Sequence, residues 1–133
     1  MKILVIDAQG GGVGRQLVSA IKQNLPNAFV TAVGTNSTAT SAMLKAGADG
    51  AATGENAVIV GCRSADVIVG PLGIVIADSL LGEVTPRMAL AVAQSNAKRI
   101  LIPFHHCDNI IVGVSDFNIG KLVQHVISEL QKM

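Results

Sequence analysis

The sequence contains no tryptophan, no tyrosine and only three phenylalanines. Proteins that hold single-stranded nucleic acid stack the bases on aromatic side chains, so this scarcity counts against such a partner. An excess of one charge is also missing, because a formal net charge of +1 provides no basic face for a phosphate backbone. No apolar run approaches the roughly 20 residues that span a bilayer. We therefore expect neither nucleic acid nor a membrane as a partner.

Cysteine is scarce as well, since Cys62 and Cys107 are the only two and lie far apart in the sequence. The first apolar run covers residues 3–6 and is interrupted by Asp7, which makes it too short for the apolar part of a secretion signal. Both observations predict a cytoplasmic protein whose two thiols are reduced.

Aliphatic residues dominate the composition. Half of the residues are hydrophobic, 14% are charged and 2% are aromatic, which suits a parallel sheet that is covered by helices. A length of 133 residues is typical of one domain with one core. We expect a single domain over residues 1–133.

Strand-like and helix-like patterns alternate along the chain. They predict strands at 2–7, 28–34, 49–53, 66–71 and 98–104, and helices at 13–24, after Asn36 or Ser37, at 55–64, at 73–81, from Pro86 to Ser95 and at 117–131. The connection to a further apolar segment at 110–114 is too short for a parallel crossover, so we expect an antiparallel strand there. The predicted fold class is α/β: a three-layer, Rossmann-like, doubly wound and mostly parallel sheet with an antiparallel last strand.

A glycine-rich loop joins the first predicted strand to the first predicted helix. This arrangement places unpaired backbone N–H groups beside the positive end of the helix, where an anion binds well. Side chains in the loop would block the approach of a phosphate. We predict that the phosphates of a nucleotide are held by Gly10, Gly11, Gly12, Val13 and Gly14. A tight turn without a ligand is the alternative.

Three known glycine loops resemble this one. Aligned on the dinucleotide-binding pattern GxGxxG, Gly11 and Gly14 match, and Gln9 replaces the first glycine. The segment GGVGR is similar to part of the short-chain dehydrogenase loop, but those enzymes need a tyrosine, which this chain lacks. The segment QGGGVGRQ resembles the deviant P-loop of the ParA and MinD ATPases, with Arg15 and Gln16 replacing the phosphate-binding lysine and the magnesium-binding threonine. Because both groups are lost, we discount an ATPase.

The segment after the second predicted strand is where dinucleotide-binding domains read the ribose, with an acid for NAD or a basic residue for NADP. Here the segment has neither and holds Thr35, Asn36, Ser37 and Thr38. Their hydroxyl and amide groups predict a second anion site that accepts a 2′-phosphate, and hence a preference for NADP over NAD. Capping of the second helix is the alternative.

A third candidate segment, with Gly70, Pro71 and Gly73, ends the fourth predicted strand. If the strand order is 3-2-1-4-5, this segment lies next to the glycine loop, where ligands of such folds bind. The two glycines would then let a ribose or a ring lie against the backbone. A tight turn around Pro71 is the alternative.

Two further groups of polar residues bear on metal binding and catalysis. In an extended chain His105 and Cys107 face one way while His106 and Asp108 face the other, so each face offers too few ligands and we expect no metal. Asp7 ends the first predicted strand, and we expect its carboxylate to accept hydrogen bonds from N–H groups of the glycine loop.

Four segments that span nearly the whole chain are IDAQGGGVG, GTNSTATSAMLKAGA, GPLGIVIADSLLGEVTP and ILIPFHHCDNIIVGV. Together they resemble a family of short bacterial proteins of unknown function, common in clostridia and their relatives, with a Rossmann-like fold. The resemblance implies a nucleotide-binding fold and says nothing about chemistry.

These features favour a non-catalytic or regulatory protein that binds a nucleotide, a dinucleotide of the NAD(P) type ahead of a mononucleotide, with NADP or NAD as the cofactor. The first alternative is a small NAD(P)-dependent oxidoreductase whose active site is completed at a dimer interface, with His105, His106 or Asp78 as acid or base. The second alternative is an interaction module without a ligand.

The predicted helix at 73–81 is apolar nearly all round, because only Asp78 and Ser79 interrupt it. Such a helix must be covered on both sides, and the sheet covers only one. We therefore expect a homodimer that buries this helix or the one that follows Pro86.

Overall fold

The computed structural model describes residues 1–103, 109–115 and 117–133. Its centre is a five-stranded sheet with the order β3-β2-β1-β4-β5, in which every pair of neighbouring strands is parallel. The strands are β1 (Lys2–Asp7), β2 (Phe29–Gly34), β3 (Gly50–Thr53), β4 (Val67–Pro71) and β5 (Lys98–Ile102). This order confirms the 3-2-1-4-5 arrangement on which the predicted site depends.

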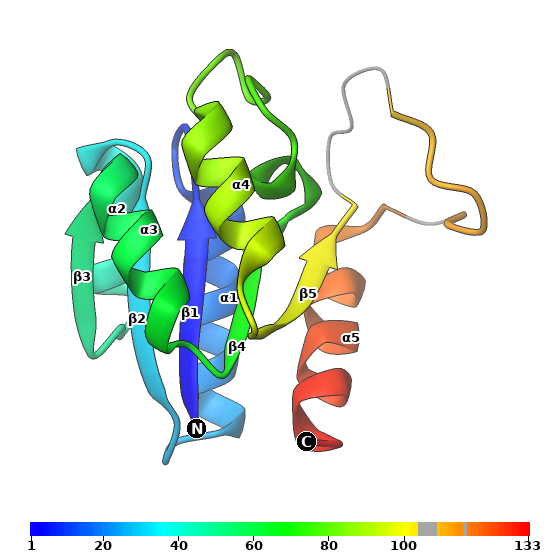
Figure 1. Cartoon of the computed structure of the whole chain (residues 1–133). Coiled ribbons are helices and arrows are strands. Elements are labelled where there is room, and N and C mark those ends of the chain that lie inside the picture. The colour runs from blue at the N-terminus through cyan, green and yellow to red at the C-terminus, as the bar shows by residue number, and fades with distance from the viewer. Residues whose placement is uncertain (104–108, 116) are drawn as a thin grey trace.

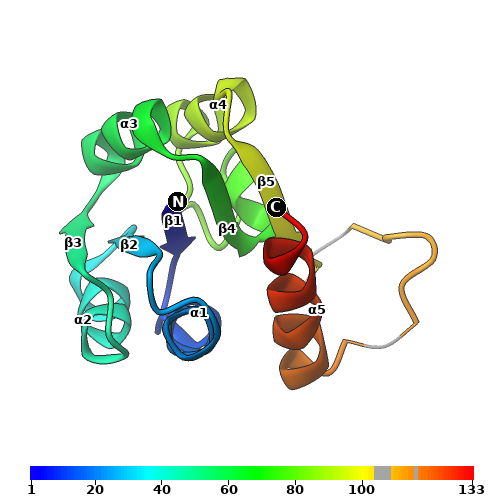
Figure 2. The ribbon, with the colours of Figure 1, turned by 90° about the horizontal axis from the view of Figure 1, so that it is seen from below.

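Helices cover both faces of the sheet, which gives three layers (Figures 1 and 2). One face carries α1 (Gly12–Asn24), α2 (Ser37–Lys45) and α5 (Ile119–Gln131), and the other carries α3 (Glu55–Ser64) and α4 (Pro86–Gln94). Each face has its own aliphatic cluster, so the sheet separates two cores. No helix in the described ranges is long and apolar enough to cross a membrane.

Two helices begin where the sequence predicts. Asn36 precedes α2, and its Oδ1 accepts a hydrogen bond from the N–H of Ala39 at 2.9 Å. Thr85 precedes α4, and its Oγ1 accepts from the N–H of Met88 at 3.1 Å while Pro86 takes the first helical position. These side chains bind N–H groups that have no partner inside the helix, which fixes the point where each helix begins.

The predicted antiparallel strand at 110–114 is wrong. Residues 109–115 contain no strand and turn at Val112 and Gly113, where the φ of Gly113 is 93°. Ile110 is 91% exposed and Val112 is 94% exposed, so their apolar pattern does not reflect burial against this sheet. The sheet consequently ends at β5, whose last residue is Ile102.

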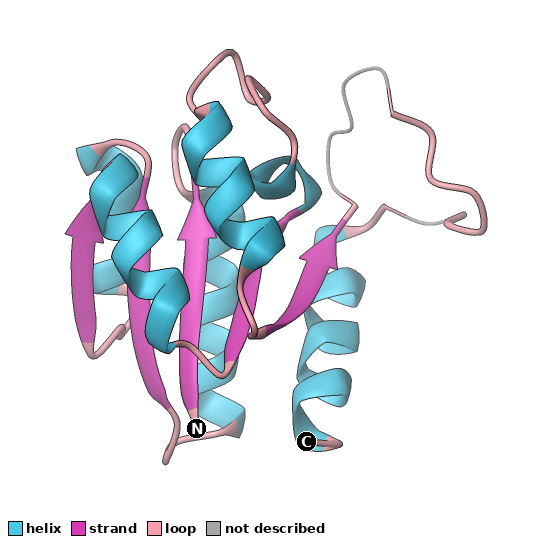
Figure 3. Ribbon diagram, in the orientation of Figure 1, coloured by secondary structure: helices cyan, strands magenta, loops and turns pink. Residues whose placement is uncertain are grey.

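The predicted helix at 73–81 is also wrong. A short 3₁₀ turn, η1 (Leu72–Val75), is followed by consecutive turns up to α4 (Figure 3). Asp78, Leu80 and Leu81 have positive φ angles of 63°, 55° and 58°, which a right-handed helix cannot contain. The loop bonds within itself instead, for example from the N–H of Asp78 to the carbonyl of Val84 at 2.8 Å.

Gly14 allows α1 to pack directly against the sheet and α2. A Cβ added at Gly14 would lie 2.5 Å from Sδ of Met43 and 2.8 Å from Cβ of Asp7, and both of these neighbours are buried. Real Cβ atoms do not approach other atoms this closely. The contact therefore requires glycine for reasons of packing.

We predict that Gly14→Ala lowers the free energy of unfolding by about 1–3 kcal/mol, because the added methyl group overpacks the contact with Met43 and Asp7. Gly12→Ala is the matched control, since a Cβ at Gly12 meets no atom within 4 Å. It should leave stability unchanged or raise it by up to about 1 kcal/mol. Urea unfolding followed by circular dichroism measures both values. Equal stability of the two variants would contradict this account of Gly14.

Candidate functional site

The loops that follow β1 and β2 meet at the carboxyl edge of the sheet, toward which the arrowheads point in Figure 1. Asp7 and Gly34 are partners in the register of β1 and β2, so the residues that follow these two strands start side by side. On its other side β1 pairs with β4, and the helices that follow β1 and β4 lie on opposite faces. In open α/β sheets this switch point is where ligands bind.

A buried carboxylate anchors the glycine loop. Asp7 is 5% exposed, its Oδ1 accepts the N–H of Ala8 at 2.8 Å, and its Oδ2 accepts the N–H of Gly14 at 2.6 Å. The predicted role of Asp7 is thus confirmed. The pKa of this carboxyl group is raised above its usual value, mainly by burial. The hydrogen bonds from Gly14 and Ala8 lower the pKa, and the negative charge of Glu83 raises it further.

The residues of the glycine loop have different environments. Gly11 is buried with a φ of 74°, and a Cβ there would lie 2.8 Å from Cα of Ala39. Val13 and Gly14 are also buried, and Val13 belongs to the hydrophobic core. Gly10 and Gly12 are exposed, and a Cβ at either position meets no atom within 4 Å. A ligand can therefore approach the backbone of the loop at Gly10 and Gly12.

Glu83 joins the two loops, and the sequence did not identify it as a site residue. Its Oε1 accepts hydrogen bonds from the backbone N–H of Gln9 at 2.9 Å, from Oγ1 of Thr35 at 2.7 Å and from Nδ2 of Asn36 at 2.8 Å. Asn36 Nδ2 also lies 3.0 Å from the carbonyl of Gln9. One carboxylate oxygen thus links the end of β1 to the end of β2.

These contacts change the interpretation of the predicted 2′-phosphate site. The hydroxyl of Thr35 and the amide of Asn36 donate to Glu83, and Oδ1 of Asn36 caps α2. Ser37 is the first residue of α2 and is exposed. The sequence predicted a site without an acid, and this premise is wrong because Glu83 brings a carboxylate to it from 48 residues beyond Thr35.

Glu83 carries a negative charge at neutral pH. Burial alone would raise its pKa, but the hydrogen bonds from Gln9, Thr35 and Asn36 bring the pKa below the usual value of 4.5. Hydrogen bonds of this kind favour the ionised form because they require an acceptor. The site therefore presents a fixed negative charge beside the glycine loop.

Backbone strain is concentrated in the glycine loop and in the loop between β4 and α4 that contains Glu83. Within the described ranges, the non-glycine residues with positive φ are Gln9, which precedes the glycines, and Asp78, Leu80 and Leu81, which precede Glu83. Such conformations persist only where the surrounding structure holds them, and they cluster at functional sites. The hydrogen bond from Gln9 to Glu83 connects the two strained segments.

The segment at the end of β4 has a structural role. A Cβ at Gly70 would lie 2.5 Å from the carbonyl oxygen of Ile6, and one at Gly73 would lie 3.0 Å from Oγ of Ser79. Pro71 is the buried last residue of β4. Gly70 is buried and Gly73 is half-buried, and atoms of the chain occupy the space beside both glycines, which agrees with the turn interpretation. The contact with a ribose or a ring stays a prediction.

Of the alternative acid–base residues, the described part of the chain contains Asp78. Asp78 lies in the strained loop between β4 and α4, where its backbone N–H, and not its carboxylate, bonds the carbonyl of Val84. His105, His106, Cys107 and Asp108 lie outside the described residues. Among the residues that are described, no three histidine, cysteine or acidic side chains lie close enough to hold a metal ion.

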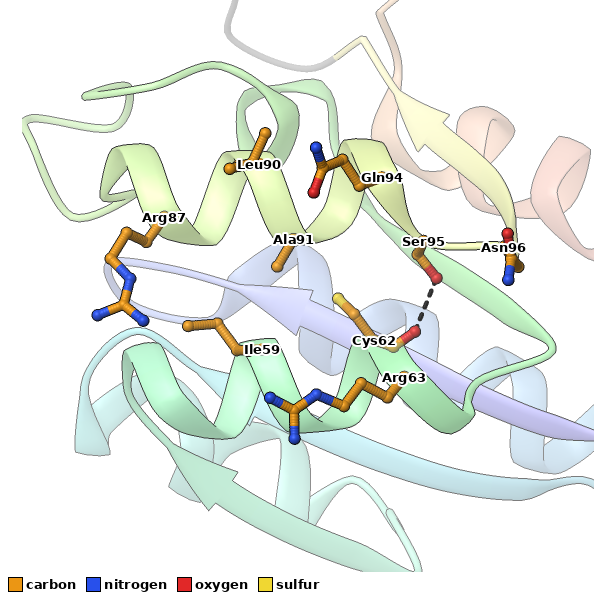
Figure 4. Close-up of a pocket in the computed structure, with 9 residues that line it drawn as sticks. All are labelled: Ile59, Cys62, Arg63, Arg87, Leu90, Ala91, Gln94, Ser95 and Asn96. Carbon is orange, nitrogen blue, oxygen red and sulfur yellow. Dashed lines mark hydrogen bonds between the residues drawn. The ribbon is translucent and has the colours of Figure 1, made fainter.

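A groove of about 450 Å³ lies between α3 and α4, and the residues that line it do not include the glycine loop (Figure 4). Arg63 and Arg87 border it, and Arg87 lies 3.5 Å from the carboxylate of Glu55.

Cys62 also lines this groove. Burial raises the pKa of the Cys62 thiol to about 11, so the thiol stays neutral and is a poor nucleophile. Ser95 Oγ donates to the carbonyl of Cys62 at 2.7 Å, which connects the two helices.

Comparison with known proteins supports the fold. No curated protein matches the chain. Among solved structures, it is similar to the dodecameric FMN-dependent UbiX-like decarboxylase of Escherichia coli O157:H7, with 21% identity and a TM-score of 0.50. The match covers 98% of this chain and 76% of the decarboxylase chain. The family model described as a domain of unknown function, DUF3842, matches residues 2–133, and the chain belongs to this family.

Proposed function

We propose that this protein binds a nucleotide at the carboxyl edge of the sheet, with the phosphates on the backbone of the glycine loop. The observation that carries the proposal is that Gly10 and Gly12 face open space at the beginning of α1, while Asp7 holds the rest of the loop in place. Exposed N–H groups at the start of a helix favour an anion. A dinucleotide of the NAD(P) type remains the first candidate.

A flavin nucleotide is the second candidate ligand. The solved structure similar to this chain is described as FMN-dependent, and FMN also carries a phosphate. The two candidates share the phosphate that the glycine loop would bind, and they differ in the ring system. Mass spectrometry of the small molecules released from purified protein distinguishes them and also detects the absence of any ligand, which would favour the interaction module.

The proposed role is binding or regulation, in the cytoplasm. Asp7 and Glu83 are the acids of the site, and the hydrogen bonds that their oxygens accept from the two loops fix them in structural positions. An oxidoreductase completed by His105 or His106 at a dimer interface is the enzymatic alternative. Turnover of NADH or NADPH by the purified protein would favour that alternative.

We also propose that the protein forms a homodimer. The predicted apolar helix at 73–81 is absent, and exposed apolar side chains elsewhere now support the proposal. Leu81 is 96% exposed, and Ile110 and Val112 are nearly fully exposed in the connection after β5. Apolar side chains that extend so far into water often contact a second chain. The similar solved structure is described as dodecameric, which agrees with self-association in general.

For the phosphate site, we expect Gly12→Val to abolish binding of the released nucleotide while the thermal transition stays cooperative. The side chain would fill the open space beside the loop without a clash in the fold. Gly50→Val is the matched control, because a Cβ at Gly50 also meets no atom within 4 Å and Gly50 begins β3 at the opposite edge. Calorimetry that gives equal affinity for wild type and Gly12→Val would refute the loop assignment.

For self-association, sedimentation at micromolar concentration should give a mass above that of one 13.6 kDa chain. Ile110→Asp combined with Val112→Asp should reduce the mass to one chain, because charges at the contact oppose its burial. Leu44→Asp is the control, since Leu44 is exposed on α2. A wild-type protein that sediments as a single chain would rule out the dimer.

A further inference from the structure

We infer that Glu83 is the specificity-determining residue of the nucleotide site, that it accepts hydrogen bonds from an unphosphorylated ribose, and that it excludes a 2′-phosphate. This inference rests on the proposed nucleotide site and adds to it which nucleotides fit. It reverses the NADP preference that the sequence predicted.

The position of Glu83 supports this role. Dinucleotide-binding domains place an acid just after the second strand, where it binds the ribose 2′-hydroxyl. In this chain Thr35 and Asn36 follow β2, and both donate to Glu83 Oε1, at 2.7 and 2.8 Å. A residue from the loop before α4 thereby brings a carboxylate to the place where the pattern requires an acid.

The hydrogen bonds leave Glu83 able to bind a ligand. All three donors from Gln9, Thr35 and Asn36 end on Oε1. Within the described residues none of these contacts uses Oε2, which can therefore accept from a hydroxyl group of a sugar. Because two loops hold the carboxylate in place, little side-chain freedom is lost when a ligand binds.

The charges near Glu83 explain the discrimination. The charge of Glu83 raises the pKa of Asp7, so the two carboxyl groups lie close enough to interact. The four residues after β2, Thr35 to Thr38, include no basic side chain that could bind a 2′-phosphate. A phosphate at this position would meet the carboxylate of Glu83 with no basic side chain among these four residues, whereas a hydroxyl group donates to it.

The closing experiment compares NAD with NADP, two ligands that differ only in the 2′-phosphate. Wild type should bind NAD at least about tenfold more tightly in calorimetry, because like charges placed together cost affinity. Glu83→Gln keeps the shape of the side chain and removes its charge, so the ratio should fall toward one. Glu55→Gln is the control, since Glu55 bonds Thr85 Oγ1 at 2.6 Å outside this site, and its ratio should match wild type.

A second arm changes the ligand and leaves the protein intact. Wild type should bind ADP more tightly than 2′-deoxy-ADP, because the deoxy ligand lacks the 2′-hydroxyl group that donates a hydrogen bond to Glu83. An unchanged NAD to NADP ratio in folded Glu83→Gln, tighter binding of NADP by wild type, or equal binding of the two ADP ligands would overturn the inference. If wild type binds none of these nucleotides and no FMN, the proposed function fails together with the inference. Binding of these nucleotides without discrimination, or binding of FMN alone, refutes the role of Glu83 alone.

Discussion

The candidate site depends on the buried carboxylate of Asp7 at the end of β1. A buried carboxyl group is costly unless hydrogen bonds compensate for it, and the N–H groups of Ala8 and Gly14 provide this compensation. By bonding Gly14, Asp7 fixes the start of α1 against the sheet, and the close contact with Met43 leaves no room for a side chain. The glycine loop is therefore held in place on its buried side, and Gly10 and Gly12 remain exposed.

The second carboxylate, that of Glu83, gives the two ends of the loop different properties. Glu83 bonds the N–H of Gln9, at the beginning of the loop, while Gly12 lies at the start of α1. A phosphate is repelled by Glu83 and attracted by the helix, so we propose that phosphates bind at Gly12 and a neutral sugar at Gln9. A nucleotide combines these two chemical groups, which is why we prefer it to a simple anion.

Local sequence patterns predicted most of the fold. Four of the five parallel strands follow from apolar runs, whereas β3, with the sequence GAAT, has only a weak strand signal. The starts of α2 and α4 follow from Asn36 and from Thr85 with Pro86. The apolar segment 73–81 misled the prediction because hydrophobicity does not reveal left-handed backbone at Asp78, Leu80 and Leu81. The expected strand at 110–114 failed for a related reason, since its apolar residues are exposed and find no strand to pair with in the described sheet.

The candidate site was predicted in part. The hydrogen-bonding role of Asp7 was predicted correctly because it depends on neighbours in sequence, and the phosphate-binding role of the glycine loop stays a prediction. Glu83 was missed because its partners Gln9 and Thr35 are 74 and 48 residues away, and only the folded chain brings them together. No local signal marks this glutamate. It follows Gly82 in a loop, directly after a segment that was predicted to be a helix.

The most direct test of this account is a map of backbone and side-chain amide shifts by nuclear magnetic resonance during titration with NAD. The account predicts that the largest changes occur at Gln9, Gly10 and Gly12 and at the side-chain amide of Asn36. Residues that line the α3–α4 groove, such as Arg87 and Leu90, should shift little. Changes confined to that groove, or no changes in the glycine loop at saturating NAD, would contradict it.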